Sequence, residues 1–189
     1  MIGELPRELS VNGCDYAIRT DFRDILKIVT AFNDPELEDN EKVYICLVIL
    51  YEDFEDIPRE DYEAAFKAAI RFIDQSDDDT EEDDPRKNPR VMDWEQDESI
   101  MFPAINKVAG FETRSAEYVH WWTFMGYYME ISEGVFSNVL SIRIKKAKGK
   151  KLEKWEREFW NSNKGICALR EKLSEEEQAE KDRLNALLG

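Results

Sequence analysis

The residues best suited to chemistry lie in one aromatic stretch, EYVHWWTFMGYYMEI, residues 117–131. It contains His120, the single histidine of the chain, and Glu117 three residues before it. Helical bundles that bind two irons use two such Glu-x-x-His pairs and two further glutamates, so one histidine cannot complete the set. Zinc lacks ligands too, since the cysteines are widely separated, at Cys14, Cys46 and Cys167. A symmetric oligomer that pools its histidines is the remaining route to a metal site.

Nucleophilic catalysis would depend on the same histidine. A Ser–His or Cys–His pair would need His120 as its base, and the sequence lacks the glycine-rich elbow that accompanies many such nucleophiles. Phosphate-binding loops of the Walker or dinucleotide type are also absent from the sequence. We therefore expect no catalytic residues, no metal and no cofactor, and we interpret His120 as a capped or rim residue of a packed helix.

Two groups of carboxylates remain as candidate ligands. Asp93 and Asp97 are four residues apart, so on a helix they could hold magnesium or act as acid and base. Acids in the first turn also stabilise a helix through its dipole, and we prefer that interpretation. The acidic run of residues 74–84 does not fit an EF-hand loop, because the sixth and twelfth positions are Asp79 and Pro85 instead of glycine and glutamate.

The most basic segment is RIKKAKGKKLEKWEREFW, residues 143–160. Seven bases, the first of them Arg143, lie between residues 143 and 154 against the single acid Glu153. Bases beside aromatic side chains can bind single-stranded nucleic acid. They also suit the C-terminus of a helix and the loop after it, or could pair with the acidic run. We favour the helix C-terminus and keep the other two interpretations as alternatives.

Charge is distributed unevenly over the 189 residues, whose formal net charge is −16. Residues 1–110 carry 29 acids and 12 bases, whereas residues 111–189 carry 13 acids and 14 bases. So acidic a chain repels nucleic acid and anionic membranes, which favours a basic or apolar protein partner. The longest apolar run, residues 43–51, falls short of the roughly 20 residues that span a bilayer. Without a signal-peptide pattern or paired cysteines, we expect a soluble intracellular protein.

The elements that must position these residues follow the spacing of apolar side chains. Asn12 and Gly13 predict a type I′ turn within an N-terminal hairpin. Helical spacing predicts a helix over residues 20–32, with Thr20 or Asp21 as its cap. Residues 33–53 open with Asp34 before Pro35 in a first turn and then become apolar on every face, which favours a fully buried helix and leaves a strand as the alternative.

Beyond these elements the composition changes sharply. A helix over residues 58–75 is predicted to bury the stripe Tyr62, Phe66, Ile70 and Ile73. Residues 75–91 are so acidic and so poor in apolar side chains that a mobile linker is expected. Further helices are predicted over residues 92–110, 117–131, 133–146 and 151–162, and a polar one follows a capping box at Ser174 and Glu177.

The aromatic stretch fits a central core helix. On a helical wheel two adjoining stripes form one wide apolar face: Trp121, Phe124 and Tyr128, then Tyr118, Trp122, Met125 and Met129. Gly126 would allow a neighbouring helix to approach closely. The predicted fold is mainly α, a helical bundle with a short N-terminal β-hairpin and two helical parts joined by the acidic linker. The expected boundaries are 1–74 for the hairpin and first helices, 75–91 for the linker, 92–165 for the aromatic-rich part and 166–189 for a polar tail.

Four segments resemble one phage family in their order: YAIRTDFRDIL, MDWEQDESIMFPAINKVAG, YVHWWTFMGYYMEI and FSNVLSIRIKKAKGKKLEKWEREFW. That family is the helical gp-fifteen-type protein encoded just before the tape-measure gene in long-tailed phages and prophages of Gram-positive bacteria. The resemblance covers residues 8–165. Two features depart from the pattern of the family: Pro103, which interrupts the helix after Asp93, and the very acidic linker. Its recurring positions, none with a catalytic role that we can transfer, are Asp21, Phe22, Arg23, Asp93, Asp97, His120, Trp121, Trp122, Phe124 and Arg143.

The resemblance implies a tail-assembly chaperone in the host bacterial cytoplasm. Such a protein would bind the tape-measure protein, a long helical chain with much apolar surface, and keep it soluble until the tail tube surrounds it. The major tail protein, a companion chaperone and a second copy of this chain are further candidate partners, whereas membrane and nucleic acid are not expected. The motif positions would then serve structure or partner binding. A permanent structural part of the tail and a carboxylate metal-dependent hydrolase are the alternatives.

Overall fold

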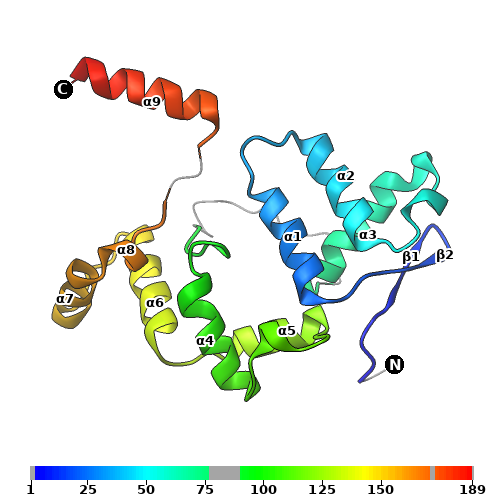
Figure 1. The fold of residues 1–189 in the computed structure, drawn as a ribbon, viewed down its shortest axis with the longest axis horizontal. Coiled ribbons are helices and arrows are strands. Elements are labelled where there is room, and N and C mark those ends of the chain that lie inside the picture. Colours follow the sequence, from blue (N-terminus) through cyan, green and yellow to red (C-terminus); the bar gives the residue numbers. More distant parts are fainter. Residues whose placement is uncertain (1–2, 77–89, 171–172, 189) are drawn as a thin grey trace.

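A computed structural model describes residues 3–76, 90–170 and 173–188. Over these residues the protein is mainly α-helical, as predicted, with one two-stranded sheet near the N-terminus (Figure 1). The strands are β1 (Glu8–Val11) and β2 (Cys14–Ala17). The α-helices are α1 (Phe22–Phe32), α2 (Asp39–Leu50), α3 (Tyr62–Asp74), α4 (Glu98–Ala109), α5 (Trp121–Met129), α6 (Val135–Ala147), α7 (Lys154–Ser162), α8 (Lys164–Cys167) and α9 (Glu175–Leu188). Short 3₁₀ helices cover Phe54–Asp56, Arg59–Asp61 and Thr113–Ser115.

The hairpin turns at Asn12 and Gly13, which confirms the prediction. Their φ angles are 49° and 89°, and a type I′ turn needs positive φ at both positions. The two strands pair antiparallel. Directly after β2, Ile18 forms a bridge with Tyr51, which attaches the hairpin to the end of α2.

Helices α1 and α2 form as predicted, although α2 is less buried. Asp21 caps α1 by accepting a hydrogen bond from the backbone N–H of Arg23. A capping box of Glu38 and Glu41 starts α2, so this segment is a helix and not a strand. The expectation of burial on every face is wrong, because one side of α2 contacts α1 and α3 while Tyr44, 56% exposed, lies on the other.

Helix α3 buries a face that is shifted from the predicted stripe. Its most buried positions are Ala65 and Ala69, both 0% exposed, and Phe72. Of the predicted stripe, Ile73 is buried as expected, whereas Tyr62, Phe66 and Ile70 are half-buried. The small alanine side chains let α3 pack closely against α2 and β1, and the larger residues flank that contact.

Helix α5 is shorter than predicted, since it begins at Trp121 and not near residue 117. Trp121 and Phe124 are buried, in agreement with the first predicted stripe. The second stripe is partly wrong, because Met129 is 64% exposed where α5 ends. A Cβ atom on Gly126 would meet no atom within 4 Å, so close helix approach does not require glycine there.

The C-terminal helices separate into two groups in Figure 1. Helices α6, α7 and α8 lie together next to α4, whereas α9 stands apart from them at the C-terminal end. The predicted capping box is present at α9, where Ser174 Oγ accepts from the N–H of Glu177 and the Glu177 carboxylate accepts from the N–H of Ser174. No helix of the described residues is long and apolar enough to span a membrane.

One core joins the two helical parts. Buried side chains from α1, α2 and α3 form a single cluster with those from α4, α5 and the start of α6. The predicted mobile linker spans residues 75–91, of which residues 77–89 lie outside the part of the chain that the structure describes. The division of the chain into domains stays a proposal.

Candidate functional site

The ten motif positions form two clusters that hold helices together. The α1–α5 joint contains Asp21, Phe22, Arg23, His120, Trp121, Trp122 and Phe124. The α4–α6 joint contains Asp93, Asp97 and Arg143. Nearly every polar atom of these side chains has a partner in the fold, so the geometry of the partners indicates what the positions do.

Asp21 connects the start of α1 to the segment before α5. Besides capping α1, its carboxylate accepts from Arg23 Nη1 at 2.9 Å and from the backbone N–H of Val119 at 3.1 Å. Two backbone hydrogen bonds reinforce the connection: the N–H of Trp121 donates to the carbonyl of Thr20 at 2.7 Å, and that of Phe22 to Val119 at 3.0 Å. The carboxylate is thus surrounded by donors that belong to the fold.

His120 is the N-cap of α5 and is 3% exposed, so its placement at a rim is wrong. Its Nδ1 accepts from the N–H of Trp122 at 3.0 Å, and its Nε2 lies 2.9 Å from the carbonyl of Pro6. Since a carbonyl can only accept, Nε2 carries the proton and the ring is neutral. Burial lowers the pKa of His120, the hydrogen bond to Pro6 opposes this, and the charge of Arg7 lowers the pKa further. Both nitrogens are engaged, so neither is available as a base or ligand.

The two neighbouring tryptophans close the C-terminal end of α3. Trp121 Nε1 donates to the carbonyl of Ile73 at 2.8 Å, and Trp122 Nε1 donates to that of Phe72 at 2.9 Å. The last carbonyls of a helix have no partner within it, so these indoles satisfy groups that would otherwise be buried unpaired. The aromatic stretch therefore positions α3 against α5.

Phe22 and Phe124 complete the α1–α5 joint. Their ring centroids are 4.2 Å apart and their planes differ by 9°, a stacked contact between α1 and α5. Both side chains are at most 1% exposed. Buried aromatic pairs of this kind contribute roughly 0.5–1.5 kcal/mol beyond the burial of their area.

Arg143 is the centre of the α4–α6 joint. Its Nη1 and Nη2 bind the two carboxylate oxygens of Asp97 at 2.7 and 2.8 Å. The three other N–H groups donate to the carbonyls of Val91, Ile166 and Cys167 at 2.7–3.0 Å. A guanidinium has five N–H donors, so all are used. One buried side chain thus connects α6 to the segment before α4 and to α8.

The carboxylates of Asp93 and Asp97 do not face each other across an open site. Asp93 lies in the turn before α4 and accepts from the N–H groups of Glu95 and Gln96, so its expected place within a helix is wrong. Asp97 accepts from the backbone N–H of Asp93 as well as from Arg143. Across residues 3–76, 90–170 and 173–188, no three His, Cys, Asp or Glu side chains are grouped to hold a metal. The absence of a metal or cofactor in the functional protein stays a prediction.

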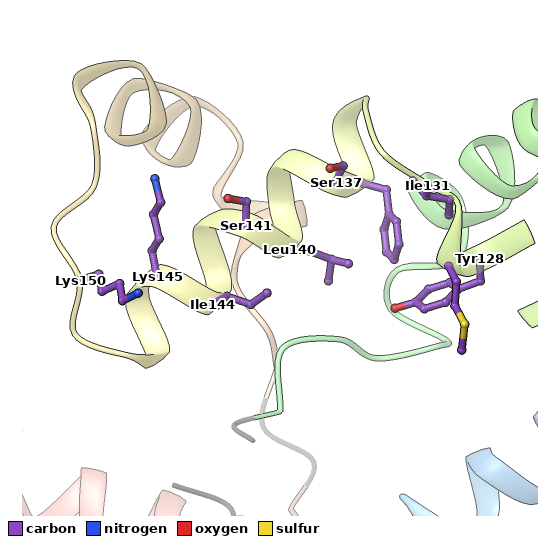
Figure 2. Close-up of a pocket in the computed structure, with 10 residues that line it drawn as sticks. Tyr128, Ile131, Ser137, Leu140, Ser141, Ile144, Lys145 and Lys150 are labelled. Carbon is purple, nitrogen blue, oxygen red and sulfur yellow. The ribbon is translucent and has the colours of Figure 1, made fainter. Parts of the chain in front are cut away.

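An apolar groove of about 520 Å³ runs along α6 (Figure 2). Its walls come from the end of α5, the turn after it and one face of α6, where Leu140 and Ile144 point to the same side. Its apolar lining residues are Tyr128, Met129, Ile131, Phe136, Leu140 and Ile144. Ile144 is 39% exposed and Met129 64%, so the groove presents apolar side chains to solvent.

Lysines lie at one end of this groove, at the C-terminus of α6, and Tyr128 and Ile131 lie at the other (Figure 2). Lys145 pairs with Glu156 at 2.6 Å, and this contact holds the pKa of the Glu156 carboxyl below its usual value. The Lys146 ammonium lies over the ring of Trp160, with Nζ 3.9 Å from the ring centroid. The basic stretch thus ends a helix, in agreement with the favoured interpretation. The alternative that the basic stretch pairs with the acidic run stays a prediction, because residues 77–84 of that run lie outside the described residues.

A second hollow of about 540 Å³ lies between α1 and α4. Phe22, Trp94 and Phe102 contribute aromatic surface to it. The cations at its edge are already paired: Arg23 with Asp21, Lys27 with Asp24 and Arg114 with Glu112. Because these cations are paired, the hollow offers a ligand fewer available charged groups than the α6 groove does.

Sequence reasoning identified the residues of both joints but not their partners. Asp97 and Arg143 are 46 residues apart, and nothing local marks one arginine among seven bases as the buried one. The sequence does not predict the groove either, because charged residues dominate the pattern of α6. The spacing of Phe136, Leu140 and Ile144 at four-residue intervals is the signal that could have indicated it.

Comparison with protein families matches residues 1–169 to the family described as bacteriophage Gp15 protein. The match includes both joints and the whole groove. Comparisons with curated proteins and with solved structures find no match.

Proposed function

This chain belongs to the bacteriophage Gp15 protein family, and on that premise we propose that it is a tail-assembly chaperone. In this role it binds the tape-measure protein and keeps that protein soluble while the tail forms. It acts in the cytoplasm of the host bacterium, for which the sequence resemblance suggests a Gram-positive species.

The observation that carries this proposal is the exposed apolar groove on α6. A chaperone of this kind must cover apolar helical surface on its partner, and a helix in an apolar groove is a common way for proteins to do so. The exposed thioether of Met129 is suited to such contacts, since methionine adapts its shape to different partners. The motif residues support a scaffold role, because their polar groups are bound within the fold.

The charge of the chain supports the same function in a different way. A formal net charge of −16 keeps copies of the protein apart and would keep a complex with an apolar partner dispersed. The major tail protein, a companion chaperone and a second copy of the chain are further candidate partners. Permanent incorporation into the tail is the second candidate function, and it is compatible with the same groove.

Co-expression with the cognate tape-measure protein tests the proposal. We expect the tape-measure chain to move from the insoluble to the soluble fraction and to co-purify with this protein. Mass spectrometry of purified virions and of assembly intermediates separates the two functions. A chaperone is present in intermediates and absent from virions, whereas a tail component occurs in virions at fixed copy number. If the tape-measure chain stays insoluble and this protein occurs in virions at a fixed copy number, the chaperone function is refuted and the structural function replaces it.

A further inference from the structure

We propose that the α6 groove binds an amphipathic helix of the partner, with acidic side chains at the end that meets the lysines. This inference rests on the proposed function and specifies the partner segment. It follows from three features of the groove: its length, its apolar lining and the placement of its cations.

The length suits a short helix. Along α6 the lining runs from Phe136 to Ile144, and Lys150 and Ile131 extend it at the two ends. At about 1.5 Å per residue, the stretch of α6 from Phe136 to Ile144 is about 12 Å long, a little over two turns. With the extensions at both ends, the groove suits a bound helix of roughly 10 residues or more. Apolar side chains at every third or fourth position of that helix would face Leu140 and Ile144.

The groove is largely preformed. At its apolar end, the hydroxyl of Tyr128 donates to the sulfur of Met92 at 3.0 Å, and its ring packs against Phe136 at 5.9 Å. At its cationic end, Lys145 is held by Glu156, which is 1% exposed. Walls that are fixed before binding lower the entropy cost of holding a helix.

The position of Lys150 is set by the backbone. The N–H of Gly149 donates to the carbonyl of Lys146, and that of Lys150 donates to the carbonyl of Lys145. With Gly149 at a φ of 64°, these bonds form a Schellman motif that turns the chain back at the end of α6. Among the described residues Lys150 makes no ion pair, so this cation at the mouth is available to a partner carboxylate.

Charge complementarity identifies the acidic partner. Arg143 and Lys145 are already paired with Asp97 and Glu156, but Lys148, Lys150 and Lys151 are exposed and make no ion pair among the described residues. In a chain whose net charge is −16, this local positive charge opposes that of the whole protein. Acids stabilise a helix when they lie in its first turn. A partner helix with an acidic first turn at Lys150 would therefore run antiparallel to α6, with its apolar residues extending towards Tyr128.

A pair of peptides tests the inference with the full chain. The probe is a fluorescein-labelled helix of about 14 residues with glutamates in its first turn and leucines at every third or fourth position. In the control peptide, lysines replace the glutamates and the leucines stay. Fluorescence anisotropy should show micromolar binding of the acidic peptide and about tenfold weaker binding of the lysine peptide. Equal binding of the two peptides would overturn the charge assignment.

Two matched protein variants locate the contact. Ile144→Glu changes the groove, and Val108→Glu changes an equally exposed residue of α4, since both side chains are 39% exposed. We expect the first variant to bind the acidic peptide about tenfold more weakly and the second to bind it as the wild type does. Equal affinities for the two variants, with unchanged melting temperatures, would place the contact elsewhere and refute the inference. Lys150→Glu should weaken binding and reduce its dependence on salt.

Other occupants give different results in sedimentation of the protein alone. A loss of mass in Ile144→Glu would mean that a second copy fills the groove, and a more extended monomer would mean that α9 of the same chain does. Either result overturns the inference.

Co-expression with the tape-measure protein distinguishes failure of the groove assignment from failure of the proposed function. If Ile144→Glu and wild type solubilise that chain equally, the groove assignment fails and the function stands. If wild type does not, the function fails, and the peptide experiment still decides the groove.

Discussion

Arg143 and Asp97 form a two-point ion pair between α6 and the start of α4, with distances of 2.7 and 2.8 Å and side chains that are 4% and 1% exposed. Removing one partner of such a pair leaves the other charge buried without compensation, which costs about 3–5 kcal/mol. We therefore expect Arg143→Met to lower the free energy of unfolding by this amount, measured by urea denaturation. The double variant Arg143→Met/Asp97→Leu should be more stable than the single one. A single-variant loss below about 1 kcal/mol, the range of exposed ion pairs, would contradict this account.

His120 should make stability depend on mild acid. Burial lowers its pKa in the folded protein, so the unfolded chain binds a proton more readily between the lowered value and the usual value of about 6.5. Its contribution is complete above pH 6.5 and is lost as the pH falls through the folded-state pKa. Melting temperatures at pH 7.5 and 5.5 should therefore differ more for wild type than for His120→Asn, in which asparagine keeps a capping side chain. Equal differences for the two proteins would show that His120 does not titrate in this way.

Trp121 should be a core residue and not a binding residue. It is 2% exposed, so Trp121→Ala should cost ~3–5 kcal/mol. Trp121→Phe keeps an aromatic ring but leaves the carbonyl of Ile73 without its donor, at a cost of about 1–3 kcal/mol. Thermal and urea unfolding measure both. Trp155→Ala is the control, since Trp155 is 49% exposed and should leave the melting temperature unchanged. A near-wild-type Trp121→Ala would refute the core assignment.

The three cysteines should differ in reactivity towards a thiol reagent such as Ellman's reagent. Cys14 is exposed, whereas Cys46 and Cys167 are buried. Burial raises the pKa of the Cys46 thiol to about 12 and also raises that of Cys167, which the charge of Arg143 partly offsets. Only thiolates react, so the folded protein should release one equivalent of dye quickly and the denatured protein three. Rapid reaction of the folded Cys14→Ser variant would contradict the burial of the other two.

Truncation after Leu173 should leave the fold intact. The capping bonds of α9 join Ser174 to Glu177, and Gln178 donates to Asp182 of the same helix, so these contacts are local. The helix also stands apart from α6, α7 and α8 in Figure 1. We expect the melting temperature of the truncated protein to match that of the full chain in calorimetry. A marked decrease would show that α9 contributes to the core.

The sequence by itself determined the features that depend on neighbouring residues. The turn at Asn12 and Gly13 and the caps at Asp21 and Ser174 are fixed by backbone conformation and short side chains within a few residues. The mainly α class likewise follows from helical spacing that any tertiary arrangement must bury. These predictions were confirmed because local chemistry and the final fold require the same conformations.

The tertiary structure decided which distant groups meet. Arg143 pairs with Asp97, 46 residues away, and the indole of Trp121 donates to the carbonyl of Ile73, 48 residues away. The sequence shows that these residues are present but not that they meet. Hydrogen bonds of this kind form only after apolar burial has brought the helices together, and many acids and carbonyls could have accepted them equally well. The groove has the same origin. Its lining comes from the end of α5, the turn after it, α6 and the segment beyond α6, and the packed structure leaves Ile144 39% exposed. Nothing within α6 specifies which of its apolar side chains stays uncovered.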